Sequence, residues 1–430
     1  METTGETTED KTLTVRQGLN DLEILDDTYF QKDRDTKIQE KFDSVMEQIE
    51  KEYSGYGDDA AKESEYIYLK SKAQDFMPTL QKEAKEGMEK ALELNGENYE
   101  AIRDLGVVYY KEKDYLRSME FYNKALEIKG DDRKCLGYLS IALRAAPTKD
   151  DAQKQENLEK GITLAKEAIN QDIMDGYSWY LLGNSYMSAF FTLEKYEYLD
   201  NSLKAYTQSE KTQKYPNPDL YFNRASICTY FERYSEAIRD YMTAHSIDPG
   251  LNGQSKAEKI VEFVIGTTRM IEQKKKSKNK KTSDLVKELP KALGEVKFLS
   301  TRETEETFKY KLLPQPDFEA GENRGVIFSA KVICQIHKDP PVPACFLVID
   351  SSHTYSVVSL YSIHKGIKDK IKYGDEILIR DPVLMFISIE YQSRLLTYPS
   401  IRVIHISDIL VNQETLSDVY GKAEAISESQ

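Results

Sequence analysis

Residues 219–249 read DLYFNRASICTYFERYSEAIRDYMTAHSIDP, and this stretch decides the fold of the first half of the chain. Large and small residues recur at helical spacing in two runs that are separated by a short break and followed by a proline: Tyr221 and Ala225, then Ala237, Tyr241 and Ala244, then Pro249. Residues three or four positions apart share one face of a helix, so the stretch predicts two amphipathic helices joined by a turn. Such a pair cannot bury its apolar face alone, which favours a stack of similar pairs.

A second copy of the pattern fixes the period. It lies at Ala101–Gly130, with Leu105, Gly106 and Tyr109 in the first helix and Ser118, Tyr122 and Ala125 in the second. The spacing is that of the tetratricopeptide repeat (TPR), in which small residues let paired helices pack closely. Weaker copies lie at Tyr66–Leu94 and Lys134–Ile169, and an atypical copy lies at Asp175–Ser209. We therefore expect about five repeats, the fourth with about seven extra residues between its helices around Thr192–Tyr198.

Further helices are expected to close this array at both ends. Arg34–Tyr53 and Ser255–Ile271 carry apolar residues at helical spacing. Residues 1–12 are rich in Thr and Glu and are predicted to be a disordered tail. The helices that cap the start of the array are then expected in 13–60, and the array with its C-terminal capping helix in 61–272.

The pattern changes after Met270. Six lysines lie between Lys274 and Lys281 and predict a solvated linker within a basic, irregular segment, 273–322, with a nuclear-import or nucleic-acid patch as the alternative. In 323–415 apolar residues alternate in five runs that begin near Val326, Cys345, Tyr355, Tyr373 and Ser400, the fourth starting with a turn, and a helical segment is possible at Ile363–Ile371. This pattern favours a small OB-fold barrel, followed by a tail at 416–430. The expected fold class is therefore mainly α: a TPR superhelical array followed by a small β-barrel.

Composition excludes several classes of function. The net charge, 59 − 73 = −14, disfavours nucleic-acid binding by the whole chain, because phosphate needs a concentrated basic surface. The chain has no apolar run of membrane-spanning length and no signal-peptide pattern, so we expect an intracellular protein without membrane contact. The four cysteines stand singly and the five histidines lack ligand spacing, so neither a metal nor a cofactor is expected. No catalytic motif is present, which predicts a protein that is not an enzyme and, we expect, is a monomer.

The barrel leaves a nucleic-acid alternative open. Residues 324–412 hold ten Lys or Arg and eight Asp or Glu, so their net charge is only 10 − 8 = +2. Five aromatic residues are available as stacking platforms for single-stranded nucleic acid: Phe346, Tyr355, Tyr361, Tyr373 and Tyr391. A barrel that contacts protein or has a structural role, with these aromatics in its core, is the favoured interpretation.

The concave face of the array is the candidate binding site. Consensus positions 2, 5, 9 and 12 of each first helix form one stripe on that face. The stripe predicts a peptide groove in which Asn184 holds backbone groups, Tyr180, Met187 and Phe222 take apolar side chains, and Arg144 and Asp219 bind opposite charges. The alternative is that Arg144 and Asp219 pair with each other and only stabilise the stack. Asn223-Arg224-Ala225 also resembles a clamp for chaperone C-terminal carboxylates, although Tyr180 stands where such clamps carry lysine.

The order of parts and several local stretches resemble the tetratricopeptide repeat protein 5 (Strap) family. The stretches are Met174–Tyr186, Asn217–Leu220 and Asn223–Ala225, and the resemblance extends over Glu65–Asn412. It implies that the groove binds the Met-Arg-Glu N-terminus of nascent tubulin at the ribosome and couples, through a decay adaptor, to decay of tubulin mRNA. This process is tubulin autoregulation. The resemblance also implies a second role, as a nuclear, stress-linked cofactor of acetyltransferase-dependent transcription, so both cytoplasm and nucleus are expected locations.

The same resemblance assigns roles to single residues. Arg144, in Leu143-Arg144-Ala145, matches the arginine that meets the glutamate of the peptide, and Asp219 matches the aspartate that meets its arginine. One departure is visible. A glutamate that the family carries just after the last Asp-Pro falls near Gly253 here, and no acidic residue lies between Pro249 and Glu258.

Overall fold

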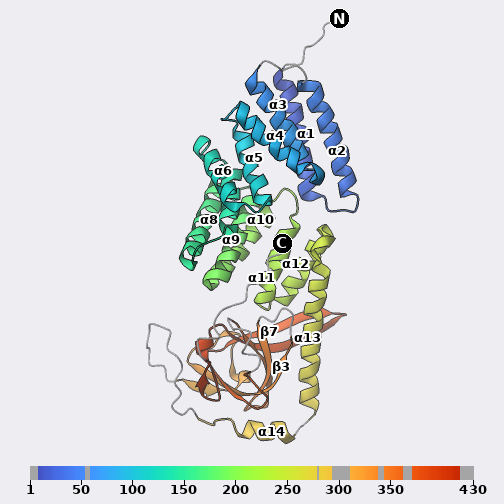
Figure 1. The fold of residues 1–430 in the computed structure, drawn as a ribbon. Coiled ribbons are helices and arrows are strands. Elements are labelled where there is room, and N and C mark those ends of the chain that lie inside the picture. Colours follow the sequence, from blue (N-terminus) through green and yellow to red (C-terminus); the bar gives the residue numbers. More distant parts are fainter. Residues whose placement is uncertain are drawn as a thin grey trace. The chain divides into compact units, whose positions relative to one another are not determined.

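The computed structural model describes residues 8–53, 59–277, 280–292, 310–337, 343–361 and 370–416 (Figure 1). It divides into two compact units. The first unit runs to Leu220 and includes Ile247–Pro249, and the second comprises Tyr221–Ser246 and the chain from Gly250 onward.

The first unit is helical. Its helices are α1 (Thr8–Thr28), α2 (Arg34–Tyr53), α3 (Ala60–Gln74), α4 (Gln81–Leu94), α5 (Tyr99–Lys111), α6 (Tyr115–Ile128), α7 (Arg133–Ala145), α8 (Asp151–Gln171), α9 (Gly176–Leu193) and α10 (Tyr196–Thr212), with the 3₁₀ turn η1 (Pro78–Leu80) before α4. Helix α11 (Pro218–Tyr230) begins in this unit and continues in the second. Within the described residues, α3–α11 together with α12 (Tyr234–Ile247) form the five expected helix pairs, and the fold class is confirmed.

Glycine–tyrosine contacts hold two of these pairs together. A Cβ atom on Gly106 would lie 2.5 Å from the Tyr122 ring, and one on Gly183 would lie 2.5 Å from the Tyr206 ring. The Oγ of Ser118 donates to the Gly106 carbonyl, and the Oγ of Ser202 donates to that of Gly183, both at 2.8 Å. The first helix of each pair therefore approaches the second closely only because its contact residue has no side chain.

The extra residues of the fourth repeat do not form a long loop, which corrects the expectation for Thr192–Tyr198. Only Glu194 and Lys195 separate α9 from α10, and Glu194 adopts the left-handed conformation with φ 53°. The insertion lengthens the helices instead, to 18 and 17 residues. The lengthened end of α9 is stable because the Phe190 ring is buried and packs against the Tyr196 ring, with centroids 5.3 Å apart.

The predicted tail at 1–12 is also corrected, since α1 begins at Thr8. Val15, Leu19 and Leu22 of α1 recur at spacings of four and three, and all three are buried against α2 and α3. This apolar stripe anchors α1, and a Thr- and Glu-rich start does not oppose a helix because Glu is a good helix former. The helix expected at Arg34–Tyr53 is α2, with the same bounds.

The second unit combines helices with a barrel-like sheet. After α11 come α12 (Tyr234–Ile247), η2 (Pro249–Leu251), α13 (Gly253–Lys276) and α14 (Lys280–Lys287). The strands are β1 (Lys311–Leu313), β2 (Gly321–Glu322), β3 (Val326–Ile336), β4 (Ala344–Asp350), β5 (Tyr355–Leu360), β6 (Glu376–Arg380), β7 (Val383–Tyr391), β8 (Arg394–Val403), β9 (Ile409–Val411) and β10 (Glu414–Thr415), with 3₁₀ turns at Gln315–Asp317 and Ile406–Asp408. Their order is β10-β9-β6-β3-β4-β5-β8-β7-β2, and β1 pairs with β3.

The five predicted strands correspond to β3, β4, β5, β6 and the end of β8. The hairpin partner β7 is missing from the prediction, although β7 pairs with β8 from Val383–Arg402 to Tyr391–Arg394. Its turn residues, Gln392 and Ser393, have φ of 48° and 58°, a geometry that glycine or asparagine usually signals. The helix expected at Ile363–Ile371 falls largely outside the described residues.

The two units divide within α11 rather than at the basic run, and much of the predicted linker, 293–309, lies outside the described residues. The loop between α11 and α12 is packed into the barrel, where the Glu232 carboxylate is 2% exposed and accepts hydrogen bonds from Ser359 Oγ at 2.8 Å, Tyr361 OH at 3.0 Å and Ser400 Oγ at 3.2 Å. Helix α13 packs against β7 and β8. Its last residues are Lys274, Lys275 and Lys276, so half of the basic run extends a helix rather than beginning a linker. The last repeat and the capping helix therefore belong with the barrel.

Most of the proposed stacking platforms lie in the core. Phe346, Tyr355 and Tyr361 are buried, and the hydroxyl of Tyr361 is held by Glu232. Tyr373 and Tyr391 remain exposed, by 56% and 38%. The aromatics therefore serve mainly as core residues, as the favoured interpretation of the barrel expected. No helix in the described part of the chain is long and apolar enough to span a membrane.

Candidate peptide groove

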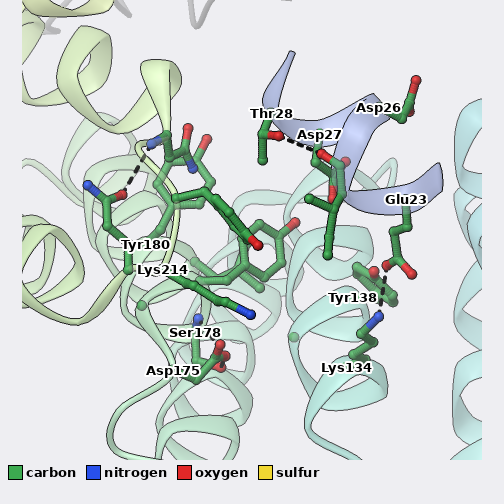
Figure 2. Close-up of a pocket in the computed structure, with 18 of the residues that line it drawn as sticks. Glu23, Asp26, Asp27, Thr28, Lys134, Tyr138, Asp175, Ser178, Tyr180 and Lys214 are labelled. Carbon is green, nitrogen blue, oxygen red and sulfur yellow. Dashed lines mark hydrogen bonds and ion pairs between the residues drawn. The ribbon is translucent and has the colours of Figure 1, made fainter. Parts of the chain in front are cut away.

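A groove of about 690 Å³ opens on the first unit, along the first helices of successive repeats. Its walls come from α1, α5, α7 and α9 and from the segment between α10 and α11. Figure 2 shows the end of α1 facing α7 and α9, with Glu23 and Asp27 on one side and Tyr180 and Lys214 on the other. Of the predicted peptide-binding residues, Tyr180 and Asp219 line this groove.

Ion pairs hold α1 against the concave face. Arg16 donates from Nη2 to Glu65 of α3 at 3.1 Å and to Glu100 of α5 at 2.9 Å. Two turns later, Glu23 accepts from the Nζ of Lys134 on α7 at 2.8 Å (Figure 2). Glu100 and Lys134 each stand at position 2 of the concave stripe, so α1 already occupies the stripe in the second and third repeats.

A buried charge network lies beside α1. Asp104 of α5 is 3% exposed and contacts the Nζ of Lys72 at 3.0 Å, the Nε of Arg103 at 2.8 Å and the hydroxyl of Tyr68 at 3.0 Å. Burial alone would raise the pKa of Asp104, but the positive charges of Lys72 and Arg103 outweigh burial and hold that pKa well below its usual range. Asp104 therefore stays ionised and fixes two cations in the wall of the groove.

Asp27, in the last turn of α1, brings to the groove a carboxylate that forms no ion pair with a described residue. Partial desolvation between the walls, and then the carboxylates of Glu23 and Asp26, raise the pKa of Asp27 from 3.8 to about 6, against the weaker opposing effect of Lys134 and Lys72. A cationic group of a ligand would relieve this repulsion.

Aromatic rings line the opposite wall. The rings of Tyr177 and Tyr180 lie 5.9 Å apart, and those of Tyr180 and Tyr206 lie 6.2 Å apart. Tyr177 is 47% exposed, so it offers an open ring face to a ligand. Two predicted residues instead support this wall from behind: Asn184 accepts from the Tyr206 hydroxyl at 2.6 Å, and Met187 is buried with its sulfur 3.9 Å from the same hydroxyl.

Arg144 lies on α7 two turns beyond the groove residue Gly137, on the same helix face. Its Nη1 donates to Ser188 Oγ at 3.1 Å, its Nε is buried without a partner, and no carboxylate of the described residues forms an ion pair with it. A half-buried guanidinium in this state leaves donors available for an added carboxylate.

Asp219, at the start of α11, is half-buried and likewise forms no ion pair with a described residue. Burial, and then the charge of Asp248, raise the pKa of its carboxyl group above the ordinary value. The alternative that Arg144 and Asp219 pair with each other is not what the structure contains. Both charges are unneutralised, which is the arrangement that a charged ligand would compensate.

Two further predicted residues belong to the second unit. Phe222 is 8% exposed and packs edge-on against Tyr241 with ring centroids 5.1 Å apart, and Asn223 is 9% exposed. Arg224, the basic residue of the clamp-like Asn-Arg-Ala triplet, is buried and bonded to Asp240, Nε to Oδ2 at 2.6 Å. Because this arginine is buried in an ion pair within the protein, it is not placed to bind a ligand, which argues against a clamp for chaperone carboxylates.

Gly253, near which the family's glutamate falls, has no room for a side chain. A Cβ atom there would lie 2.2 Å from the carbonyl oxygen of Tyr241. Close packing of the start of α13 on α12 therefore explains the glycine. The chain therefore has no carboxylate at position 253.

The contribution of α1 to the groove was missed by sequence reasoning, which gave the N-terminal helices only a capping role. A signal was present, because Arg16 and Glu23 lie on α1 seven residues apart, a spacing that puts both charges on one face. Among the described residues no cluster of three or more His, Cys, Asp or Glu is arranged to hold a metal ion.

Comparison with known proteins agrees with this architecture. Residues 309–421 match the family model described as the tetratricopeptide repeat protein 5 OB fold domain, and residues 103–132 and 218–250 match a tetratricopeptide repeat model. The chain is 29% identical to tetratricopeptide repeat protein 5 of Mus musculus over 403 residues, 90% of each chain. It is also 29% identical to the Homo sapiens protein of that name, over 85% of this chain and 83% of that one. The resemblance predicted from the sequence is confirmed, and the chain is a TPR protein-interaction adaptor with an OB-fold domain.

Proposed function

We propose that this adaptor, similar along most of its length to tetratricopeptide repeat protein 5, binds a short peptide with adjacent basic and acidic residues in the groove of its first unit. The proposed ligand is the Met-Arg-Glu N-terminus of nascent tubulin at the ribosome. Binding couples, through a decay adaptor, to decay of tubulin mRNA. The protein acts without catalysis, in the cytoplasm, and meets its partners through protein surfaces.

One observation carries this proposal: two charges of opposite sign, Arg144 and Asp219, are unneutralised on helices that form the concave face. A peptide with a glutamate and an arginine side by side supplies both counter-charges at once. The exposed ring of Tyr177 and the half-buried ring of Tyr180 offer an apolar surface for the flanking Met and Ile side chains.

Titration of a Met-Arg-Glu-Ile peptide tests the site. Arg144→Ala and Asp219→Ala should each weaken binding by about 1–3 kcal/mol, the scale for a lost charge-assisted hydrogen bond. Neither residue forms an ion pair with a described residue, so the free energy of unfolding from thermal melts should change by less than about 1 kcal/mol. Calorimetric titration and melts of the same samples measure both effects.

A charge exchange sharpens this test. A Met-Glu-Glu-Ile peptide should not bind the native protein, because it places a carboxylate beside Asp219, and Asp219→Arg should restore part of its affinity. Lys149→Ala, which removes an exposed cation beyond the end of α7, is the matched control and should leave affinity unchanged. Native affinity in both single variants would remove Arg144 and Asp219 from the site.

The competing role, a nuclear cofactor that binds transcription coactivators through the same groove, differs in where the protein acts. Sequencing of the mRNA fragments protected by ribosomes that co-purify with the protein separates the two. Enrichment of tubulin messages, lost with Asp219→Ala, agrees with the proposed function. A nuclear pool without such enrichment would favour the cofactor role.

A further inference from the structure

Helix α1 combines features of a cap and of a ligand-binding element. Its apolar residues Val15, Leu19 and Leu22 pack against α2 and α3, as in a cap. Its charged residues instead reach across the concave face, to Glu65, Glu100 and Lys134. A cap needs only the first set of contacts. We propose that α1 is a wall of the ligand groove, and that the Glu23–Lys134 ion pair is a positioning contact that sets the distance between this wall and α7.

The lining of the groove supports this inference. Seven of the lining residues come from α1 and the segment directly after it: Asn20, Glu23, Ile24, Asp26, Asp27, Thr28 and Phe30. They face Tyr138 of α7 and Tyr180 of α9, and Figure 2 shows α1 approaching these helices from the other side of the space. Without α1, the surface left by α7 and α9 would be open on that side.

The two ends of α1 are held differently. Toward its start, Arg16 donates hydrogen bonds to the carboxylates of Glu65 and Glu100, which belong to different repeats. The nearby Val15 and Leu19 are buried in the core. Toward its end, beyond Leu22, Asp26 pairs with Arg34 of α2. Among the described residues one ion pair reaches α7, Glu23 with Lys134, and these side chains are 29% and 46% exposed. Across the groove, the described ion pair that sets the end of α1 relative to α7 is therefore a weak, exposed contact.

A ligand in the groove would touch both walls. It follows that α1 contributes to affinity and that breaking the Glu23–Lys134 pair weakens ligand binding, although this pair is separate from the charges of Arg144 and Asp219. The same arrangement confines a ligand to the part of the stripe that α1 leaves open. This inference rests on the proposed peptide-binding function of the groove.

The test uses the full-length protein and an array of short peptides, Met-X-X-Ile, in which the two central residues are varied. On the peptide that binds best, Glu23→Lys should lower affinity about tenfold, because two lysines then face each other and the end of α1 moves away from α7. Lys134→Glu should act alike. The exchanged pair Glu23→Lys/Lys134→Glu should recover affinity to within about threefold of native.

Two further readouts separate a wall from a purely structural helix. Amide hydrogen exchange in 20–28 should slow when the peptide binds the native protein, whereas thermal melts of all variants should remain close to native. Glu40→Lys, the same charge change on the exposed face of α2, is the matched control and should leave affinity unaltered.

The outcomes are distinguishable. Selection of peptides other than Arg-Glu contradicts the proposed ligand but still tests α1 on the selected peptide. Native affinity in Glu23→Lys, or unchanged exchange in 20–28 on binding, overturns the role of α1. An array without any binding peptide overturns both proposals.

Discussion

At the scale of single residues, the first unit places ionised groups according to whether they have partners. Asp104, with Lys72, Arg103 and Tyr68 around it, is committed to the fold. Arg144 and Asp219 are also partly buried, yet they form no ion pair with any described residue. Selection for stability alone would favour pairing or replacing such charges, so their presence is the residue-level argument for a ligand.

Asp27 should make the peptide affinity of the groove depend on pH. Its pKa in the folded protein is about 6, above the ordinary 3.8, and the charged groups around it are Glu23, Asp26, Lys134 and Lys72. A cationic peptide favours the ionised form, so affinity should fall as pH decreases from 7 to 5 and Asp27 takes up a proton. Titrations at several pH values measure this decrease. In Asp27→Asn the decrease should be smaller, and an identical pH profile in this variant would show that Asp27 does not face the ligand.

The effect of pH on folding stability through Asp27 has the opposite direction to its effect on peptide affinity. Because the folded pKa lies above the unfolded one, ionised Asp27 opposes folding above about pH 6, and this penalty disappears as pH falls toward 4. Asp27→Asn should therefore stabilise the protein at pH 7, by less than about 1 kcal/mol because the side chain is exposed and screened. The gain should vanish near pH 4, which denaturant melts at both pH values can measure.

At the scale of elements, the repeats show what sequence spacing can and cannot predict. The pairs of small and large residues, Gly106 with Tyr122 and Gly183 with Tyr206, are visible in the sequence because they determine how closely two helices approach. The hairpin of β7 and β8 was missed because Gln392 and Ser393 adopt positive φ without the usual turn residues. The ladder between β7 and β8, rather than the local preference of the turn residues, fixes this hairpin.

Gly106→Ala tests the close approach of α5 and α6. The added methyl group would lie 2.5 Å from the Tyr122 ring, so either the ring or the helix must shift, at a cost of about 1–3 kcal/mol. Chemical denaturation should show this loss. Gly266→Ala is the matched control, because no atom lies within 4 Å of its new methyl group and alanine favours the helix by up to about 1 kcal/mol. Equal stability of both variants would mean that the repeat tolerates a wider helix spacing.

At the scale of the whole molecule, the sequence located both folds but not the boundary between the units. Repeat period and strand alternation are local signals, and they separate a TPR array from a barrel correctly. The packing of the last repeat on the barrel depends on Glu232 meeting Ser359, Tyr361 and Ser400, residues that lie more than 120 positions later in the chain. No spacing rule links such distant residues. The groove wall formed by α1 was missed for the same reason, since Arg16 meets Glu100 84 positions away.

The position of the boundary leads to a prediction about fragments. A fragment of residues 214–430 retains α11–α13 with the barrel, whereas residues 309–430 form the barrel alone. Removing the helices would leave the hydroxyls of Ser359 and Ser400 without the Glu232 carboxylate and would uncover the Tyr361 ring, which packs against Tyr230 with centroids 5.0 Å apart. The shorter fragment should therefore melt at least about 5 °C lower than the longer one, or aggregate.

Variants of the longer fragment assign this difference to its cause. Glu232→Ala removes a carboxylate that accepts from three buried hydroxyls and lies 4.0 Å from the Nε of Arg402, so it should destabilise the fragment by about 2–4 kcal/mol. Glu232→Gln retains an acceptor in the same space and should cost less. If the barrel alone melts like the longer fragment and Glu232→Ala is neutral there, the packing of the last repeat contributes nothing to stability. The independent domain would then begin after the basic run, where the lysines of 274–281 suggested it.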